Sequence, residues 1–193
     1  MTTATEKLEV VNAAVQSKED KYLTFALGTE EYGLEIMKVR EIIGYLEVTR
    51  VPQTPRYVKG VINLRGQVIP VIDLRVKFGM EAVETTDATC IIVVETSQND
   101  RNVSVGVIVD RVSEVLDIAG EDIEEAPNFG GDVNTDFILG MAKVENSVKT
   151  LLDIDKVLGN VEYDNLSDAG NSQPDQGDQG DQQQDQQLQD QQQ

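Results

Sequence analysis

Histidine is absent from the 193-residue sequence, and cysteine occurs once, at Cys90. Without histidine the chain has no phospho-accepting histidine, no histidine general base and none of the common His-rich metal sites. One cysteine cannot form a disulfide within the chain. The phosphate-binding patterns G-x-x-x-x-G-K-[ST] and G-x-G-x-x-G are also missing. We therefore expect a protein without catalysis, cofactor or bound metal.

Long apolar runs are missing as well. No stretch approaches the ~18 apolar residues that cross a membrane, and no basic segment followed by an apolar run begins the chain. The hydrophobic content of 39% is nevertheless that of a globular protein. These features predict a soluble cytoplasmic protein with one domain, or with two small lobes that share a core.

Positive charge is scarce, with 16 Lys and Arg against 35 Asp and Glu and a net charge of −19. That balance disfavours nucleic acid or an anionic membrane as a partner, because both would be repelled. The segment from Lys38 to Lys77 reverses the trend: it holds eight basic and three acidic residues, which gives +5 and leaves −24 for the rest. The positive charge is therefore concentrated around residues 60–74.

Composition divides the chain into three parts. Residues 1–18 are weakly amphipathic, and we expect a flexible lead. Residues 164–193 are rich in Asp and Gln and contain no Lys or Arg. Such a segment cannot bury enough apolar surface to become ordered, so we predict a disordered tail. Residues 19–163 form the predicted ordered domain, with a first half of about 19–84 and a second half of about 85–163.

Most of the ordered part shows the alternation of β-strands. "YLTFAL" (22–27), "CIIVVE" (90–95) and "VSVGVIVD" (103–110) alternate apolar and other residues or run apolar, and the polar "TSQNDRN" separates the last two. Three short segments look like helical turns instead: "MKVREII" (37–43), "TPRYVKG" (54–60) and "LDIDKVLG" (152–159). The pattern predicts an all-β fold with few short helices.

An internal repeat is the most informative structural signal. Residues 60–79 align without a gap on 140–159, an offset of 80, and residues 32–43 align on 105–116, an offset of 73. Each copy has roughly 70 residues and about five short strands, which closure into a small barrel would protect from exposed edges. We therefore predict two packed β-barrels, one from each half, with a groove between them.

The stretch "GVINLRGQVIPVIDL" (60–74) reads as two strands joined by Arg65 and Gly66, because glycine accepts a positive φ at a hairpin turn. Pro70 cannot donate to a ladder, so the second strand should have an edge or a bulge there. Arg65 then projects from a rigid tip. It is either a solvated turn residue or a binding group, and the hairpin alone does not decide between them.

The ordered series "EYGLEI", "VREI", "TPRYVKGVINLRG", "VIPVIDLR" and "VGVIVDRV" closely resembles the CheW family of bacterial chemotaxis coupling proteins, from about Lys21 to Gly159. The resemblance implies two SH3-like five-stranded barrels. It also implies a non-catalytic adaptor that couples the cytoplasmic tips of chemoreceptors to the regulatory domain of the histidine kinase CheA, in arrays beneath the inner membrane.

The resemblance further implies a receptor surface in the groove between the barrels. The positions that it places there are Val39, Glu41, Asn63, Arg65, Cys90 and Val115. Each of the apolar three has an alternative interpretation as core, and Glu41 as a solvated acid. Kinase-binding residues cannot be told from core residues by sequence.

Two other functions stay open at this stage. A module of the same fold could serve another sensory array or sequester a partner, and would then bind a kinase but not chemoreceptors. A small-molecule-binding or hydrolytic β-barrel is the third class. Binding to a receptor fragment and to a kinase domain separates the first two classes, and a thermal-shift screen with metabolites addresses the third.

Overall fold

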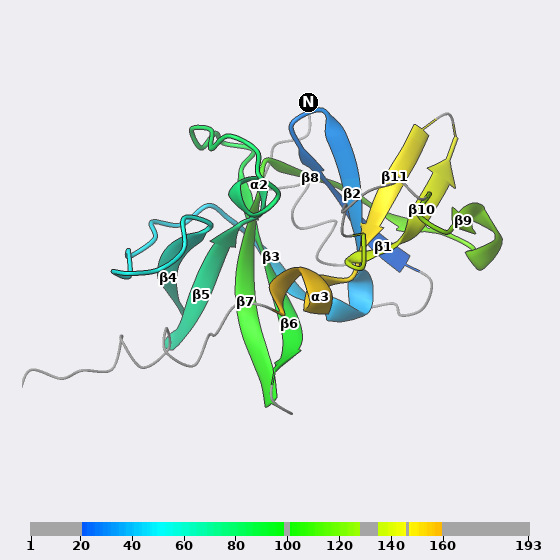
Figure 1. Ribbon diagram of the computed structural model, residues 1–193. Coiled ribbons are helices and arrows are strands. Elements are labelled where there is room, and N and C mark those ends of the chain that lie inside the picture. The colour runs from blue at the N-terminus through cyan, green and yellow to red at the C-terminus, as the bar shows by residue number, and fades with distance from the viewer. Residues whose placement is uncertain (1–20, 99–100, 128–134, 146, 160–193) are drawn as a thin grey trace, which may run out of the picture.

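The computed structural model describes residues 21–98, 101–127, 135–145 and 147–159. The predicted flexible lead and the predicted disordered tail lie outside these residues. Within them the chain forms two small barrels of the SH3-like type, which lie side by side in Figure 1. We refer to them as barrel 1 and barrel 2.

Barrel 1 is a five-stranded sheet in the order β3-β6-β7-β5-β4. Its strands are β3 (Val39–Gly44), β4 (Val58–Leu64), β5 (Gln67–Asp73), β6 (Cys90–Gln98) and β7 (Arg101–Val109). An isolated antiparallel bridge between Thr49 and Val61 adds the chain after β3 to the free edge of β4. The short helix α2 (Leu74–Lys77) follows β5.

Barrel 2 is a six-stranded sheet in the order β8-β1-β2-β11-β10-β9. Its strands are β1 (Lys21–Leu27), β2 (Glu30–Glu35), β8 (Arg111–Asp117), β9 (Ile123–Glu124), β10 (Ile138–Val144) and β11 (Ser147–Leu152). The remaining elements are two 3-10 turns and a helix: η1 (Ile36–Lys38), η2 (Gly120–Asp122) and α3 (Ile154–Leu158).

The two strand orders are the same once the halves of the repeat are superposed. When β1 to β5 are matched with β6, β7, β8, β10 and β11, the order β8-β1-β2-β11-β10 becomes β3-β6-β7-β5-β4. Both sheets also contain one parallel pair, β2 with β11 and β5 with β7. The duplicated pattern in the sequence therefore corresponds to duplicated topology.

The prediction of one barrel from each half is wrong, because the halves exchange their first two strands. Barrel 1 combines β3, β4 and β5 with β6 and β7 of the second half, and barrel 2 combines β1 and β2 with β8 to β11. Hydrophobic alternation indicates which face of a strand is buried but not which strand lies beside it. The parallel pairs join strands that are far apart in sequence, so the pattern carried no signal for the exchange.

The helix predictions are correct in one case of three. The 3-10 turn η1 is followed by the strand β3 where a helix was expected over 37–43, and a turn followed by β4 occupies 54–60. The apolar spacing of Val39, Ile42 and Ile43 fits either structure. Helix α3 was expected, and α2 was missed. The side chains of Asp73 and Asp153 cap α2 and α3, because each accepts a hydrogen bond from the backbone N–H three residues later.

Three apolar clusters hold the fold together. The largest lies between the barrels and includes Phe25, Ile72, Ile92 and Leu152, all at most 1% exposed. A second cluster of Ile and Val side chains fills barrel 1, and a third, smaller one around Leu151 fills barrel 2. Strands such as β6 are buried on both faces, since alternate residues point into barrel 1 and into the shared core.

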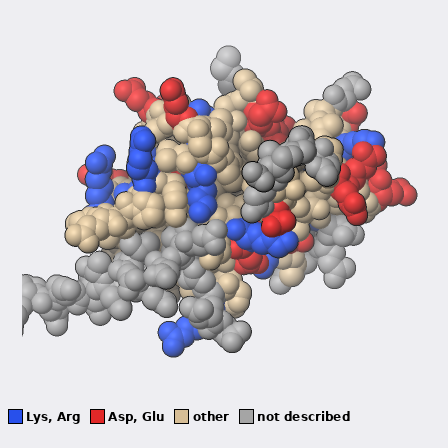
Figure 2. Space-filling model, viewed as in Figure 1, with Lys and Arg blue, Asp and Glu red and all other residues tan. Residues whose placement is uncertain are grey.

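Charge is distributed unevenly over the two barrels. Figure 2 shows Lys and Arg side chains over the β4 and β5 side of barrel 1, and Asp and Glu side chains gathered over β9 and β10 of barrel 2. The basic segment noted in the sequence therefore lies on barrel 1. In the described part of the chain, no helix has the length and apolar character needed to span a membrane.

Candidate functional site

The β4–β5 hairpin has the two-residue turn that the sequence predicts. Arg65 and Gly66 both have positive φ, 51° and 87°, as a type I′ turn requires. The side chain of Asn63 fixes the turn further, because its Oδ1 accepts a hydrogen bond of 2.8 Å from the Gly66 N–H. Pro70 pairs with Val61 and lies one residue before β5 begins to pair with β7. The expectation of an edge or a bulge at Pro70 is wrong, because β5 is an inner strand and the register shift of the β4–β5 ladder lies between Val58 and Gly60.

Arg65 uses this rigid turn to reach across the barrel to β3. Its Nη1 and Nη2 donate to Oε1 and Oε2 of Glu41 at 3.1 and 2.7 Å, which makes a forked ion pair. The Arg65 side chain is 76% exposed and that of Glu41 23% exposed. An exposed pair contributes at most about 1 kcal/mol to folding, so its main effect is to orient the guanidinium. The guanidinium has three further N–H donors for a partner.

The three apolar positions of the expected receptor surface lie in or against the core between the barrels. Val39 and Cys90 are 5% and 6% exposed and belong to the shared cluster, and Val115 is half-buried against it. The thiol of Cys90 donates to the carbonyl of Ala88 at 3.1 Å. These residues line the seam between the barrels and present little surface of their own.

The structure thus gathers the six positions into two groups. Glu41, Asn63 and Arg65 form one polar cluster on the surface of barrel 1. The apolar three form the other group: Val39 and Cys90 are buried on β3 and β6 of barrel 1, and Val115 lies on β8 of barrel 2. Whether a partner contacts them stays a prediction.

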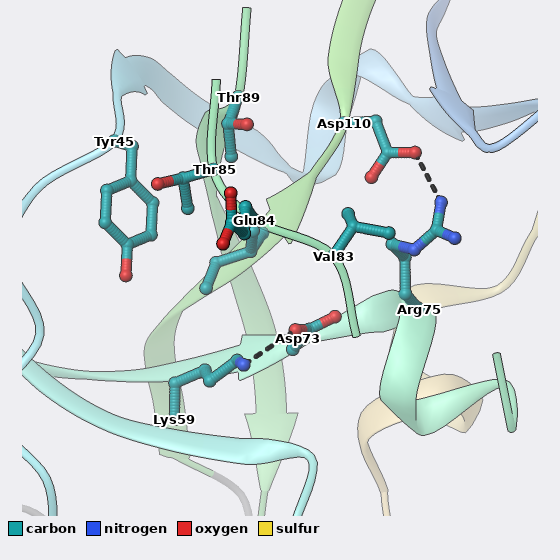
Figure 3. A pocket seen from close by; sticks show the side chains of 10 residues that line it. Tyr45, Lys59, Asp73, Arg75, Val83, Glu84, Thr85, Thr89 and Asp110 are labelled. Carbon is teal, nitrogen blue, oxygen red and sulfur yellow. Dashed lines mark hydrogen bonds and ion pairs between the residues drawn. The ribbon is translucent and has the colours of Figure 1, made fainter. Parts of the chain in front are cut away.

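A polar hollow lies at the other end of barrel 1, where β5 runs into α2 (Figure 3). Two ion pairs lie in its wall: Lys59 with Asp73 at 3.1 Å, and Arg75 with Asp110 at 2.6 Å. Tyr45, Thr85 and Thr89 complete the wall, with Val83 and Glu84 nearby. The lining thus carries two cations against three carboxylates, those of Asp73, Asp110 and Glu84, so the hollow does not favour an anion. No cluster of His, Cys, Asp and Glu able to hold a metal occurs within the described ranges.

Sequence reasoning missed a set of ion pairs that connects the barrels. Lys38 and Asp155 form one such pair at 2.5 Å, although 117 residues separate them. The hydrogen bond to Asp155 raises the pKa of Lys38. Burial acts to raise the pKa of Asp155, but hydrogen bonds from Lys38, Thr96 and Ser97 outweigh it and lower the pKa overall.

A second missed pair lies within barrel 2. Lys149 is 5% exposed and donates to Glu31, which also accepts from the Ser113 hydroxyl. The hydrogen bond from Lys149 lowers the pKa of Glu31. No local pattern in the sequence could have indicated either pair, because the partners come from strands and helices far apart along the chain.

Comparisons with known proteins agree with this architecture. The model of the CheW-like domain family matches residues 21–162. The chemotaxis protein CheW of Klebsiella aerogenes is 41% identical over 153 residues, which cover 79% of this chain and 90% of the relative. CheW of Bacillus subtilis is 37% identical over 140 residues, covering 72% and 86%. The crystal structure of the scaffolding protein TtCheW from Thermoanaerobacter tengcongensis matches with a TM-score of 0.65 and 34% identity, covering 75% of this chain and 94% of that one.

Proposed function

Because the chain belongs to the CheW-like domain family and is a chemotaxis coupling adaptor, we propose that it binds two partners: the cytoplasmic tip of a chemoreceptor and the regulatory domain of the kinase CheA. On this proposal it has no catalytic activity of its own. It acts in the cytoplasm, at receptor arrays beneath the inner membrane.

The observation that carries the receptor half of the proposal is the forked pair of Arg65 with Glu41. The pair presents an oriented guanidinium on a basic part of an otherwise acidic protein. It lies on the same barrel as Val39 and Cys90, which border the seam with barrel 2. A receptor helix could place its apolar stripe along the seam and a carboxylate or carbonyl group against Arg65.

Titration with a receptor tip fragment tests the receptor half. Arg65→Glu removes the forked donors and places a second carboxylate beside Glu41. Receptor binding should weaken by roughly 2–5 kcal/mol, whereas kinase binding should stay unchanged. Folding should change by about 1 kcal/mol or less, since the ion pair that is lost is exposed. Arg101→Glu is the matched control, because Arg101 is also exposed but starts β7 at a different hairpin.

The outcomes separate the alternatives. Normal receptor binding by Arg65→Glu would mean that the arginine is only a solvated turn residue. Binding of the kinase domain with no binding of any receptor fragment by the native protein would favour the module of another sensory array, or a sequestering protein. Unfolding of Arg65→Glu would mean that the ion pair is a structural requirement.

A further inference from the structure

Two ion pairs connect barrel 1 to barrel 2, and their helical members occupy equivalent places in the two halves. Clamp A is the pair of Lys38 Nζ with Asp155 Oδ2 at 2.5 Å. Clamp B, which Figure 3 shows, is the pair of Arg75 Nη1 with Asp110 Oδ2 at 2.6 Å. Arg75 and Asp155 are the second residues of α2 and α3 and align at the repeat offset of 80. The helices lie at separate levels of the boundary between the barrels in Figure 1.

The other member of each clamp lies where the chain crosses from one barrel to the other. Lys38 ends η1, between β2 of barrel 2 and β3 of barrel 1. Asp110 lies between β7 of barrel 1 and β8 of barrel 2. Asp110 directly precedes Arg111, the residue that aligns with Lys38 at the offset of 73. Each clamp therefore ties a crossover to the helix that ends the other half.

The acid of each clamp also holds the opposing hairpin. Asp155 accepts from the Ser97 N–H at 3.1 Å, and Asp110 accepts from the Gly28 N–H at 2.6 Å. Gly28 and Ser97 occupy equivalent positions in the two halves. Leu23 pairs with Leu34 in the first half, and Ile92 pairs with Val107 in the second half, so the first strands of the halves align at an offset of 69. The same offset relates Gly28 to Ser97. The two clamps are the same construction, made once at each crossover.

Their charges are reversed, however. In clamp A the crossover supplies the cation and the helix supplies the acid; in clamp B the helix supplies the cation. The first half thus contributes two cations, Lys38 and Arg75, and the second half contributes two acids, Asp110 and Asp155. If two first halves paired, Lys38 would face Arg75. If two second halves paired, Asp110 would face Asp155.

We infer that the clamps are a charge code that makes each half of the chain complementary to the other half and not to itself. Strand exchange between duplicated halves creates a need for such a code, because the same sheet order could also accommodate two like halves from two molecules. The pairs are partly buried, with side-chain exposures of 35% and 32% in clamp A and 14% and 24% in clamp B, so like charges would be screened incompletely.

Refolding of the full chain with inverted clamps tests the inference. Lys38→Asp with Asp155→Lys inverts clamp A, and Arg75→Asp with Asp110→Arg inverts clamp B. Either inversion keeps unlike charges within the chain but gives each half one acid and one cation, so that like halves also become complementary. Inverting both clamps restores halves of uniform charge with opposite sign. The measurement is the dimer fraction after refolding from urea at high protein concentration, by size exclusion with light scattering.

Each single inversion should raise the dimer fraction by about threefold or more over the native chain, and the double inversion should return it toward the native level. If the clamps only stabilise the fold, the opposite order is expected. The double inversion loses both acids that accept from Ser97 and Gly28, so its dimer fraction should then differ most from that of the native chain. That order, or no change in any inverted protein, would overturn the inference. The control is Lys143→Glu with Glu124→Lys, an exposed ion pair within barrel 2.

A neutral variant covers the case in which an inverted chain does not refold. Lys38→Met with Asp155→Asn removes the charges of clamp A, and the amide oxygen of Asn can still accept from Ser97. It should raise the dimer fraction by less than an inversion, since it ends the repulsion between like halves without creating attraction. A dimer fraction equal to that of the native chain would count against the code.

Discussion

The hairpins β4–β5 of barrel 1 and β10–β11 of barrel 2 are equivalent in the duplicated fold, and the residue that follows the first strand of each has the same positive φ. Arg65 and Glu145 occupy the same place at the offset of 80, with φ of 51° and 52°. Glu41 and Glu114 also align, at the offset of 73. Barrel 1 thus has an arginine opposite a glutamate, whereas barrel 2 has two glutamates at the corresponding positions.

The difference teaches that the backbone of the turn and the chemistry of the turn are separable. Duplication preserved the strand order, the positive φ of Arg65 and Glu145, and the helix caps in both barrels. The forked ion pair exists in barrel 1 alone among the described residues. A partner that binds the guanidinium would therefore recognise one of two nearly equivalent surfaces, and it would bind the molecule in one orientation.

The largest expected effect concerns the apolar core that the two barrels share. Ile72 and Leu152 are equivalent and at most 1% exposed in the cluster between the barrels. Ile72→Ala and Leu152→Ala should each lower the free energy of unfolding by roughly 2–5 kcal/mol, because each leaves a cavity in the same core. Urea unfolding of both variants measures this. A near-zero change in the free energy of unfolding at both positions would contradict the comparison, because Ile72 and Leu152 would then not be equivalent core residues of the two halves.

The next effect concerns the arginine at the hairpin turn, which barrel 1 has and barrel 2 does not. Arg65→Lys should weaken receptor binding by about 1.4 kcal/mol, or tenfold, because an ammonium cannot reproduce the planar fork. The reciprocal change Glu145→Arg should leave receptor affinity unaltered, although it places an arginine on the equivalent turn. Titration with a receptor tip fragment measures both. Gain of a second binding site in Glu145→Arg would show that the turn alone suffices.

Acid should act on barrel 2 through Glu31 and Asp155, whose pKa values lie below the usual range. A lowered carboxyl pKa stabilises the fold above the unfolded value of about 4, and this contribution is lost as pH falls through the folded pKa. The urea midpoint should therefore decrease as the pH falls from about 5 through the folded pKa values of the two carboxyl groups, and it should decrease by less in Asp155→Asn. An identical pH dependence in the variant would show that Asp155 contributes nothing.

The smallest effect is expected beyond both barrels. Deleting residues 165–193 should leave the melting temperature and kinase binding nearly unchanged, because their composition lacks core-forming side chains. Thermal unfolding and a kinase-domain titration check this. A decrease of about ten degrees in Tm, several times what most single surface changes produce, would mean that the segment packs on a barrel.

Local features of this fold could be predicted from the sequence, and long-range ones could not. The Arg65–Gly66 turn, the strands around it and the repeat follow from residue types over a few positions. The choice between strand and helix at Val39–Gly44 failed because its apolar spacing suits both. The fork from Arg65 to Glu41 and the pair of Lys38 with Asp155 depend on which strands become neighbours, and apolar periodicity carries no information about that.

Strand exchange has a consequence for the order in which the protein can fold during synthesis. Barrel 1 has all its strands once Val109 has left the ribosome, but β1 and β2 pair with β8 and β11, which end at Asp117 and Leu152. The two earliest strands must therefore wait with apolar faces and open edges for most of translation. Contacts of such long sequence separation slow folding and prolong exposure to aggregation. The nascent chain is thus expected to need chaperone protection chiefly for its first two strands.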